Sequence, residues 1–350
     1  MKPEWKTFLQ QRGAEWDADN TRVAHFGNPD QELALSLTGE IIADLSHRGL
    51  IAVMGEEAES FLQNMLSNDV RQVSATRSQL TSLNTPKGRM LAIMRLFWRE
   101  GVYYLSLPRP LVEPTLKRLR MYVLRSKVAL ESAGEALVRF GLSGERAEGL
   151  LREAWGEPPV ASDDVCTDGG VTVLRIHGPS PRFELYGELE PMQKLWQRLD
   201  VHAVPAGAAC WELLDTLAAL PEVYPETVEA FVPQMANLDR VGGVSFKKGC
   251  YPGQEVVARM HYLGKPNRRM ALLRAKAAES AQPGQGVFGD DPEAAVGTVV
   301  RAAPHPDGGI VLLAVVRLPA LTEGALHLGT VDGPKLVRLP LPYALEDNTA

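Results

Sequence analysis

The sequence predicts a mixed α+β fold in which two α+β modules precede a small all-β domain. Three observations predict this fold class. Short apolar runs that suit strands alternate with apolar stripes at helical spacing. This rhythm occurs twice along the chain without visible sequence identity, and after residue 286 the pattern consists of strands alone. Each α+β module is therefore expected to be a small sheet that helices cover on one side.

The first module follows a polar N-terminal segment. Its first helix is predicted from an apolar stripe at positions i, i+3, i+4, i+7 and i+8, which Ala58, Phe61, Leu62, Met65 and Leu66 form. The expected elements, in order, are strands within residues 39–53, a helix at 58–66, a hairpin of 80–84 and 90–98 around the turn 85–88, a strand at 102–107 and a helix at 112–123.

The second module repeats this pattern, and the tail departs from it. In the second module, strands at 171–176 and 183–186 precede a helical stripe at 192–199. Residues 277–286 are rich in Ala, Gln, Pro and Gly, which is typical of a linker. Beyond them, residues 296–302 and 310–317 are expected to be strands of the all-β domain.

Size and charge exclude several classes of protein. A chain of 350 residues is long enough for two or three domains, and 45% apolar with 23% charged residues is ordinary for a globular protein. The net charge of −6 gives no overall attraction to phosphate backbones. The best local basic run, residues 265–269, is interpreted as a solvated surface, so no direct nucleic-acid partner is expected.

Cysteine usage and hydropathy predict a cytoplasmic protein. Cys166, Cys210 and Cys250 lie far apart and are odd in number, so neither a disulfide framework nor a zinc site is expected. The N-terminus lacks the apolar core of a signal peptide, and the apolar run at 310–316 is far shorter than a membrane span. No membrane partner is therefore predicted. The histidines show no metal-ligand spacing, so no bound metal is predicted either.

The segment KKGCYPGQE, residues 247–255, carries the strongest chemical signal. It places one thiol, Cys250, after two lysines and before a helix expected to begin at Gln254. Neighbouring cations and a helix N-terminus both favour the thiolate, which is the nucleophilic form of cysteine. Pro252 and Gly253 are turn residues, so Cys250 is expected in a loop. The alternative is that Cys250 is a small apolar filler, as many free cysteines are.

Together with motifs elsewhere, this segment closely resembles the YgfZ-type folate-binding proteins, a branch of the superfamily that includes the aminomethyltransferase of the glycine cleavage system. The resemblance covers most of the chain. Its motifs are DLSHRG at 44–49, FLQ at 61–63 with SNDV at 67–70, LN at 83–84 with KGR at 87–89, and the block 231–269. Within that block, KGCYPGQE is very similar to the family signature KGCYTGQE.

The resemblance implies more about the fold than the apolar patterns of the sequence do. It implies two ferredoxin-like modules and a C-terminal β-barrel, arranged as a three-domain ring around a central cavity in which a tetrahydrofolate can sit. The predicted extents are 1–140 for the first module, 141–270 for the second module with the signature, and 271–346 for the barrel. In this family segments of the modules interleave, so such contiguous ranges are approximations.

The signature residues receive individual predicted roles. Cys250 is the reactive thiol, and Lys248 is expected to pair with a carboxylate or a folate tail. Gly249 and Gly253 keep the backbone open. Tyr251 offers a stacking face and a hydroxyl, with simple packing as the alternative. Gln254 and Glu255 are expected to cap or orient the following helix.

Asn84 and Lys87 are further candidates for folate binding. A turn between strands that face a cavity can offer an amide and a cation to a pterin or a glutamyl tail. The alternative is that both residues serve only the turn.

Two segments depart from the superfamily. An aminomethyltransferase needs a carboxylate near the reacting folate atoms, and the corresponding stretch here carries Leu91 and Ala92 with no acid. A second stretch, DTLAALP at 215–221, lacks the arginine and glycine of Arg-Ile-x-Ala-Gly-Ile-Pro, which puts a folate contact there in doubt. This stretch also fits a helix that packs Leu213, Leu214 and Leu217 into the core.

The resemblance thus implies an accessory protein that is not a turnover enzyme. It would bind a tetrahydrofolate species and support assembly or repair of iron–sulfur clusters in client enzymes through Cys250, with an effect on tRNA modification. One alternative is an active folate-dependent aminomethyltransferase or demethylase with Asp69 or Asp239 as the relocated acid. Another is a thiol redox sensor, which requires Cys166 or Cys210 to lie close to Cys250.

Overall fold

The computed structural model describes residues 1–264, 266–322 and 324–345. Two compact units divide the chain. The first unit comprises Met1–Ala58, Gln72–Ser78 and Leu96–Leu214, and the second unit comprises Glu59–Arg71, Gln79–Arg95 and Asp215–Ala350. Among the described residues, no helix has the length and apolar character needed to cross a membrane.

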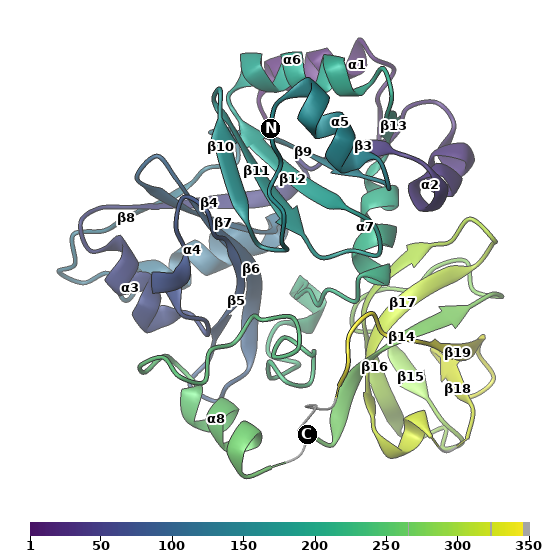
Figure 1. Cartoon of the computed structure of the whole chain (residues 1–350). Coiled ribbons are helices and arrows are strands. Elements are labelled where there is room, and N and C mark those ends of the chain that lie inside the picture. Colours follow the sequence, from purple (N-terminus) through teal and green to yellow (C-terminus); the bar gives the residue numbers. More distant parts are fainter. Residues whose placement is uncertain (265, 323, 346–350) are drawn as a thin grey trace. The chain divides into compact units, whose positions relative to one another are not determined.

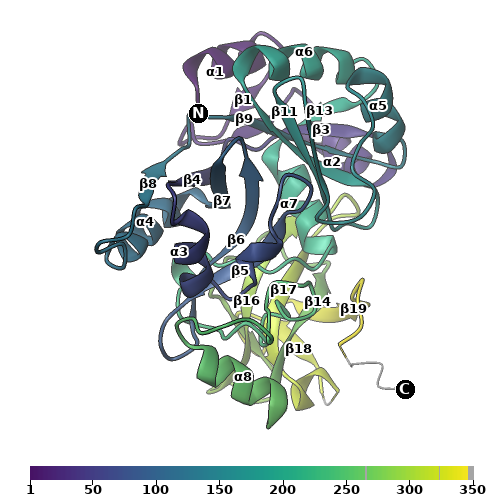
Figure 2. The same ribbon diagram turned by 60° about the vertical axis from the view of Figure 1, so that its left-hand side comes forward.

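The first unit is built on a six-stranded sheet with the order β10-β11-β12-β9-β3-β13. All of its neighbours pair antiparallel except β13 and β3, which are parallel. Helices α1, α5 and α6 lie together on one face of this sheet (Figures 1 and 2). The elements are β3 (Ile41–Asp44), β9 (Val138–Ser143), β10 (Val165–Asp168), β11 (Val171–Ile176), β12 (Arg182–Gly187), β13 (Val204–Ala206), α1 (Pro3–Gln10), α5 (Ala147–Ala154) and α6 (Leu189–Leu199).

The N-terminal segment, which the sequence predicts only as polar, contributes to this core. It forms α1, α2 (Pro29–Thr38) and a small pair of strands, β1 (Glu15–Trp16) and β2 (Val23–His25). Trp5 of α1 is fully buried, and its indole N–H donates a 2.8 Å hydrogen bond to the buried Oδ1 of Asp44. The prediction missed α1 because an eight-residue helix offers only one turn of apolar spacing among charged neighbours.

A second group of strands in the first unit surrounds β4 (Arg48–Met54). This strand pairs antiparallel with β7 (Val102–Pro108) and β8 (Ala129–Ser132). Helix α4 (Val112–Arg120) follows the short 3-10 turn η2 (Arg109–Leu111). A Cβ at Gly49 would lie 2.1 Å from Cγ2 of Val112, so glycine is needed where β4 meets α4. The predicted helix at 112–123 ends at Arg120, and residues 121–126 form turns.

The second unit begins with the elements that the sequence predicts most directly. Helix α3 (Ala58–Met65) matches the predicted apolar stripe, and β5 (Gln79–Asn84) and β6 (Met90–Arg99) match the predicted hairpin. Residues 90–95 of β6 belong to this unit. The second unit also contains η3 (Pro225–Thr227) and α8 (Gln254–Tyr262). Two further elements are divided between the units: η1 (Val70–Gln72) after Arg71, and α7 (Ala208–Leu217) after Leu214.

The C-terminal part of the second unit is a closed barrel with the order β14-β17-β16-β15-β18-β19 (Figure 1). Its strands are β14 (Arg268–Ala275), β15 (Gly286–Phe288), β16 (Ala295–Pro304), β17 (Ile310–Arg317), β18 (Leu326–Leu328) and β19 (Lys335–Leu339). Apolar side chains of β14, β16 and β17 fill its core. The predicted linker at 277–286 is wrong: it runs from β14 to β15, two strands of the same barrel, and buries Ala278.

The mixed α+β fold class with a C-terminal β-barrel is confirmed. Strands from the predicted ranges 1–140 and 141–270 share the six-stranded sheet, since β3 lies between β9 and β13. The extents of the three domains and their arrangement as a ring around a cavity stay predictions.

Candidate functional site

The signature segment 247–255 lies in the second unit and leads into α8. Its side chains differ sharply in exposure: Lys248 and Tyr251 are buried, whereas Lys247, Cys250 and Glu255 are exposed. Helix α8 begins at Gln254, as predicted. The segment is thus a surface loop that is attached to the protein through the side chains of Lys248 and Tyr251.

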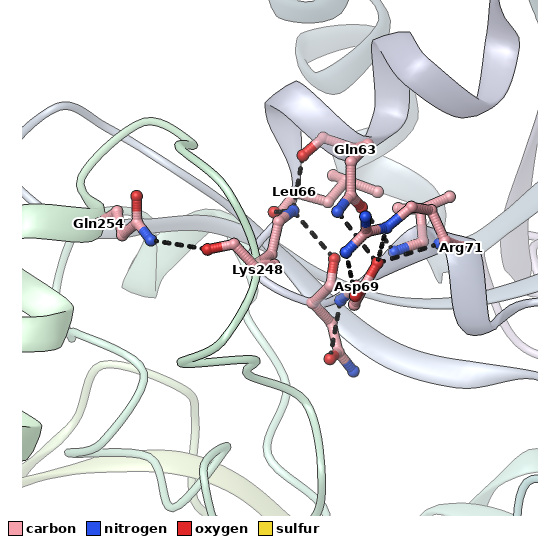
Figure 3. Close-up of polar contacts among 8 residues, drawn as sticks. Gln63, Leu66, Asp69, Arg71, Lys248 and Gln254 are labelled. Carbon is pink, nitrogen blue, oxygen red and sulfur yellow. Dashed lines mark hydrogen bonds and ion pairs between the residues drawn. The ribbon is translucent and has the colours of Figure 1, made fainter.

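Lys248 is the main attachment. Its Nζ donates hydrogen bonds to the backbone carbonyls of Gln63 at 2.6 Å, Leu66 at 2.5 Å and Asn68 at 3.0 Å (Figure 3). A lysine ammonium has three donors, and these carbonyls use all of them. Carbonyls at the C-terminal end of a helix such as α3 carry partial negative charge, which favours a cation there. These contacts differ from the predicted pairing with a carboxylate or a folate tail, because the amine is already saturated by the backbone.

An ion pair between Asp69 and Arg71 lies near Lys248. Arg71 donates to both carboxylate oxygens of Asp69, from Nε at 2.8 Å and from Nη2 at 2.7 Å, and Gln63 adds a hydrogen bond of 3.0 Å (Figure 3). The hydrogen bonds from Arg71 hold the pKa of Asp69 down at about 2. Burial lowers the pKa of Lys248 to about 8, and the nearby Asp69 charge opposes that shift. At neutral pH Lys248 therefore remains mostly protonated and able to donate three hydrogen bonds.

Two glycines bring the β5–β6 turn against the start of α8. Gly253 has a φ of +81°, and a Cβ there would lie 2.4 Å from the Thr85 carbonyl oxygen and 2.6 Å from the Gly88 amide nitrogen. Gly88 has a φ of +72°, and its Cβ would lie 3.0 Å from Cβ of Val256. Backbone of the turn and backbone of the signature are therefore in direct contact, which only glycine permits.

Gly249 does not need to be glycine. A Cβ added there would meet nothing within 4 Å, and its φ is not in the left-handed region. The prediction that both signature glycines keep the backbone open therefore holds for Gly253 but is wrong for Gly249.

Tyr251 and Gln254 support the loop from within the signature. Tyr251 is buried, burial raises its pKa, and the Lys248 amine lies 5.2 Å from the centroid of its ring. Gln254 Nε2 donates to the Lys248 carbonyl oxygen at 3.3 Å (Figure 3). Gln254 thus orients the loop and does not cap α8, whose N-cap Gly253 has no side-chain hydrogen bond. Glu255 lies in the first turn of α8, where its negative charge interacts favourably with the positive end of the helix dipole.

Cys250 is the accessible thiol of the chain. It is exposed, whereas Cys166 is partly buried and Cys210 is buried. Burial raises the pKa of Cys166, and it raises the pKa of Cys210 to about 12. Cys166 and Cys210 belong to the first unit, and Cys250 belongs to the second. In the part of the chain that the structure describes, no three His, Cys, Asp or Glu side chains gather as metal ligands do.

Asn84 ends β5 directly before the turn that contacts the signature. Its side chain is 1% exposed, and its Oδ1 accepts a 3.0 Å hydrogen bond from Ser82 Oγ. Its Nδ2 has no hydrogen-bond partner among the described residues. Buried donors without partners are uncommon, which makes this amide a candidate hydrogen-bond donor for the site. Lys87 is exposed at the turn.

The two acids proposed as relocated catalytic groups are both held by arginines. Asp69 is paired with Arg71 as described above. Asp239 accepts hydrogen bonds from Arg269 Nη1 at 2.7 Å and Nη2 at 3.1 Å. In each bidentate pair a guanidinium already occupies both carboxylate oxygens, so neither acid is free to orient a substrate amine.

The divergent stretch 215–221 begins with an aspartate that is also held in an ion pair. Asp215 lies in α7, and its Oδ2 is 3.2 Å from Nη2 of Arg301 in β16, with both side chains buried. Helix α7 buries Leu213 and Leu214, which confirms the packing interpretation for these two residues, whereas Leu217 at its end is only partly buried. The acid that stands where the family has an arginine is thus neutralised by an arginine of the barrel. Sequence spacing gave no signal for this pair, because 86 residues separate its members.

Comparison with known proteins identifies the fold. No protein-family model matches the chain. The structure is similar to the glycine cleavage system aminomethyltransferase T from Bartonella henselae, with a TM-score of 0.76 and 17% sequence identity over 98% of each chain. The chain has the fold of this aminomethyltransferase. Heterotetrameric sarcosine oxidase from Corynebacterium sp. U-96 is a weaker match, with a TM-score of 0.33 and 10% identity over 46% of this chain and 82% of that chain, and it supports no argument.

Replacing Lys248 tests its role as the attachment of the loop. Lys248→Met keeps the length of the side chain but leaves the three carbonyls of Gln63, Leu66 and Asn68 without their donor. We expect a loss of about 1–3 kcal/mol in the free energy of unfolding, measured in urea. Lys247→Met, which changes an exposed neighbour, should stay within about 0.5 kcal/mol. Equal stability of the two variants would refute the role of Lys248.

The two signature glycines are predicted to respond differently to the same change. Gly253→Ala forces a Cβ into the β5–β6 turn and a residue into the left-handed region, so we expect a loss of at least about 1–2 kcal/mol in stability. Gly249→Ala places its Cβ in open space and should be close to neutral. Thermal unfolding of both variants measures the difference, and a costly Gly249→Ala would contradict it.

The cysteines are predicted to differ in reactivity. At pH 8 iodoacetamide should modify Cys250 first, because it is exposed, while burial protects Cys210 and slows Cys166. Peptide mass spectrometry over time gives the order of labelling. The accessible-thiol assignment fails if Cys166 or Cys210 reacts as fast as Cys250 in the folded protein.

Proposed function

We propose that this chain is an accessory protein that binds a tetrahydrofolate species and supports assembly or repair of iron–sulfur clusters in client enzymes, including enzymes that modify tRNA. The observation that carries this proposal is the exposed Cys250 on a loop that Lys248 fastens to the protein. The folate and the iron–sulfur role come from the resemblance of KGCYPGQE and its companion motifs to the YgfZ-type proteins.

The contacts around the turn support folate binding. A pterin ring carries oxygen and nitrogen acceptors along one edge, and the buried Nδ2 of Asn84 is a donor in need of an acceptor. The exposed ammonium of Lys87, three residues further on, suits the carboxylates of a glutamyl tail. Because the turn touches Gly253, a ligand held at Asn84 would be bound beside the signature.

The exposure of Cys250 supports a role toward a cluster that another protein holds. Thiolates are the soft ligands that iron–sulfur clusters prefer, and a typical cluster needs four of them. This chain has three cysteines, and only Cys250 is exposed. It can therefore contribute one ligand or one nucleophile to a cluster or sulfur species on a client, and it cannot hold an ordinary cluster alone.

The absence of a free carboxylate at the expected positions supports an accessory role rather than catalytic turnover. Leu91 and Ala92 occupy β6 where an aminomethyltransferase needs its carboxylate. Asp69 and Asp239 are committed to arginines, so neither is free to replace it. An active folate-dependent aminomethyltransferase or demethylase remains the second candidate, and it is favoured only by the likeness of the fold.

Two experiments test the two parts of the proposal separately. Isothermal titration with tetrahydrofolate should give at least tenfold weaker binding for Asn84→Leu, since one buried hydrogen bond is lost, and unchanged binding for the exposed control Asn267→Leu. In a strain that lacks the wild-type copy, Cys250→Ser should fail to restore iron–sulfur enzyme activity, whereas Cys166→Ser should restore it. Full restoration by Cys250→Ser would exclude the thiol role, and glycine-cleavage turnover by the purified protein would favour the second candidate.

A further inference from the structure

A cationic surface in the first unit has no place in the proposed function. It consists of residues 117–127, KRLRMYVLRSK, which cover the end of α4 and the turns after it, and we call it the cationic loop. It contains five cations and no acid, in a chain whose net charge is −6. The cations are Lys117, Arg118, Arg120, Arg125 and Lys127.

The cationic loop also exposes large apolar side chains. Leu124 is 88% exposed, Met121 is 59% exposed and Tyr122 is 38% exposed. They are not the core face of α4, because that face is already buried through Val112, Leu116 and Leu119. Exposed apolar side chains grouped within four residues are a mark of an interaction surface.

Leu124 is unusual in its backbone as well as its exposure. Its φ is +45°, in the left-handed region that bulky residues rarely adopt. No burial of the side chain compensates for this conformation, since Leu124 is almost fully exposed. Strained residues of this kind cluster at ligand clamps and functional loops.

Hydrogen bonds hold the two ends of the cationic loop in place. Arg120 Nη2 donates to the Leu130 carbonyl oxygen at 2.8 Å. Lys127 donates to Glu57 from its backbone N–H at 2.6 Å and to Glu56 from Nζ at 2.7 Å. Lys117, Arg118 and Arg125 form no ion pair with any acid that the structure describes, and the Arg118 guanidinium lies 5.4 Å from the centroid of the Tyr122 ring. The free cations therefore flank the exposed Met121 and Leu124.

We propose that the cationic loop docks the protein on an anionic lipid surface, with Leu124 and Met121 entering the headgroup–acyl boundary and the flanking cations meeting the lipid phosphates. Clustered Lys and Arg are attracted to anionic leaflets, and apolar side chains between them add burial in the interface. Single-stranded nucleic acid, the other polyanion, is recognised by aromatic stacking as well as charge, and the only aromatic ring in the loop already lies beside Arg118. Leu124 and Met121 have no hydrogen-bonding group, so they suit a lipid surface better than single-stranded nucleic acid.

Vesicle co-sedimentation of the full chain, without folate, tests this proposal independently of the proposed function. Binding to phosphatidylcholine vesicles that contain about one third phosphatidylglycerol should exceed binding to pure phosphatidylcholine by at least about tenfold, and salt should weaken it. Leu124→Ser and the double variant Arg118→Gln/Arg125→Gln should each reduce binding by about threefold or more. Leu263→Ser is the matched control, because Leu263 is 83% exposed and lies at the end of α8.

Three outcomes would overturn the proposal. They are equal binding to neutral and anionic vesicles, equal behaviour of Leu124→Ser and Leu263→Ser, and tighter binding of a single-stranded RNA oligonucleotide that the arginine variant weakens and Leu124→Ser does not. Each variant is compared with the parent chain by thermal unfolding, and Lys117→Gln replaces the double variant if the latter unfolds early.

Discussion

The ammonium group of Lys248, held by three backbone carbonyls, is the interaction on which the candidate site depends. A buried cation is costly unless every donor is satisfied, and here Gln63, Leu66 and Asn68 satisfy all three. This requirement ties the signature to a segment about 180 residues earlier in the chain. Cys250, two residues further on, is consequently presented at the surface from a loop whose backbone is fixed on both sides, by Lys248 before it and by Gly253 after it.

The same unit shows a consistent use of charge. Asp69 and Asp239, the two candidates for a relocated catalytic acid, are each paired with an arginine, and so is Asp215. The pairs of Asp239 with Arg269 and of Asp215 with Arg301 join residues 30 and 86 positions apart, whereas Asp69 pairs with Arg71 in the same short segment. Two groups are not engaged in this way: the exposed thiol of Cys250, and the Nδ2 donor of Asn84, which has no hydrogen-bond partner among the described residues. This distribution is the basis on which we propose an accessory role for a chain that has the fold of an aminomethyltransferase.

Prediction from the sequence succeeded where a local rule decides the outcome. The stripe at Ala58–Met65, the hairpin around residues 85–88 and the start of α8 at Gln254 were all predictable from periodicity and turn chemistry. It failed where local composition and tertiary context disagree. Residues 277–286 have the composition of a linker but connect two strands of one barrel, and the short helix α1 is stable because Trp5 packs on Trp196 and Phe140. Gly249 occurs in a turn-like segment, yet its backbone is one that any residue can adopt.

The sequence by itself determined the kinds of element, the β-rich C-terminal part and the chemistry that the signature can offer, because these follow from spacing and residue type. Only the tertiary structure decided what each site residue does. Lys248 was expected to reach a carboxylate or a ligand, but a long flexible side chain bonds to whichever acceptors the fold brings near it, and these came from the end of α3. The contact between Gly88 and Gly253 and the burial of Asn84 likewise arise from segments distant in sequence, which no local pattern encodes.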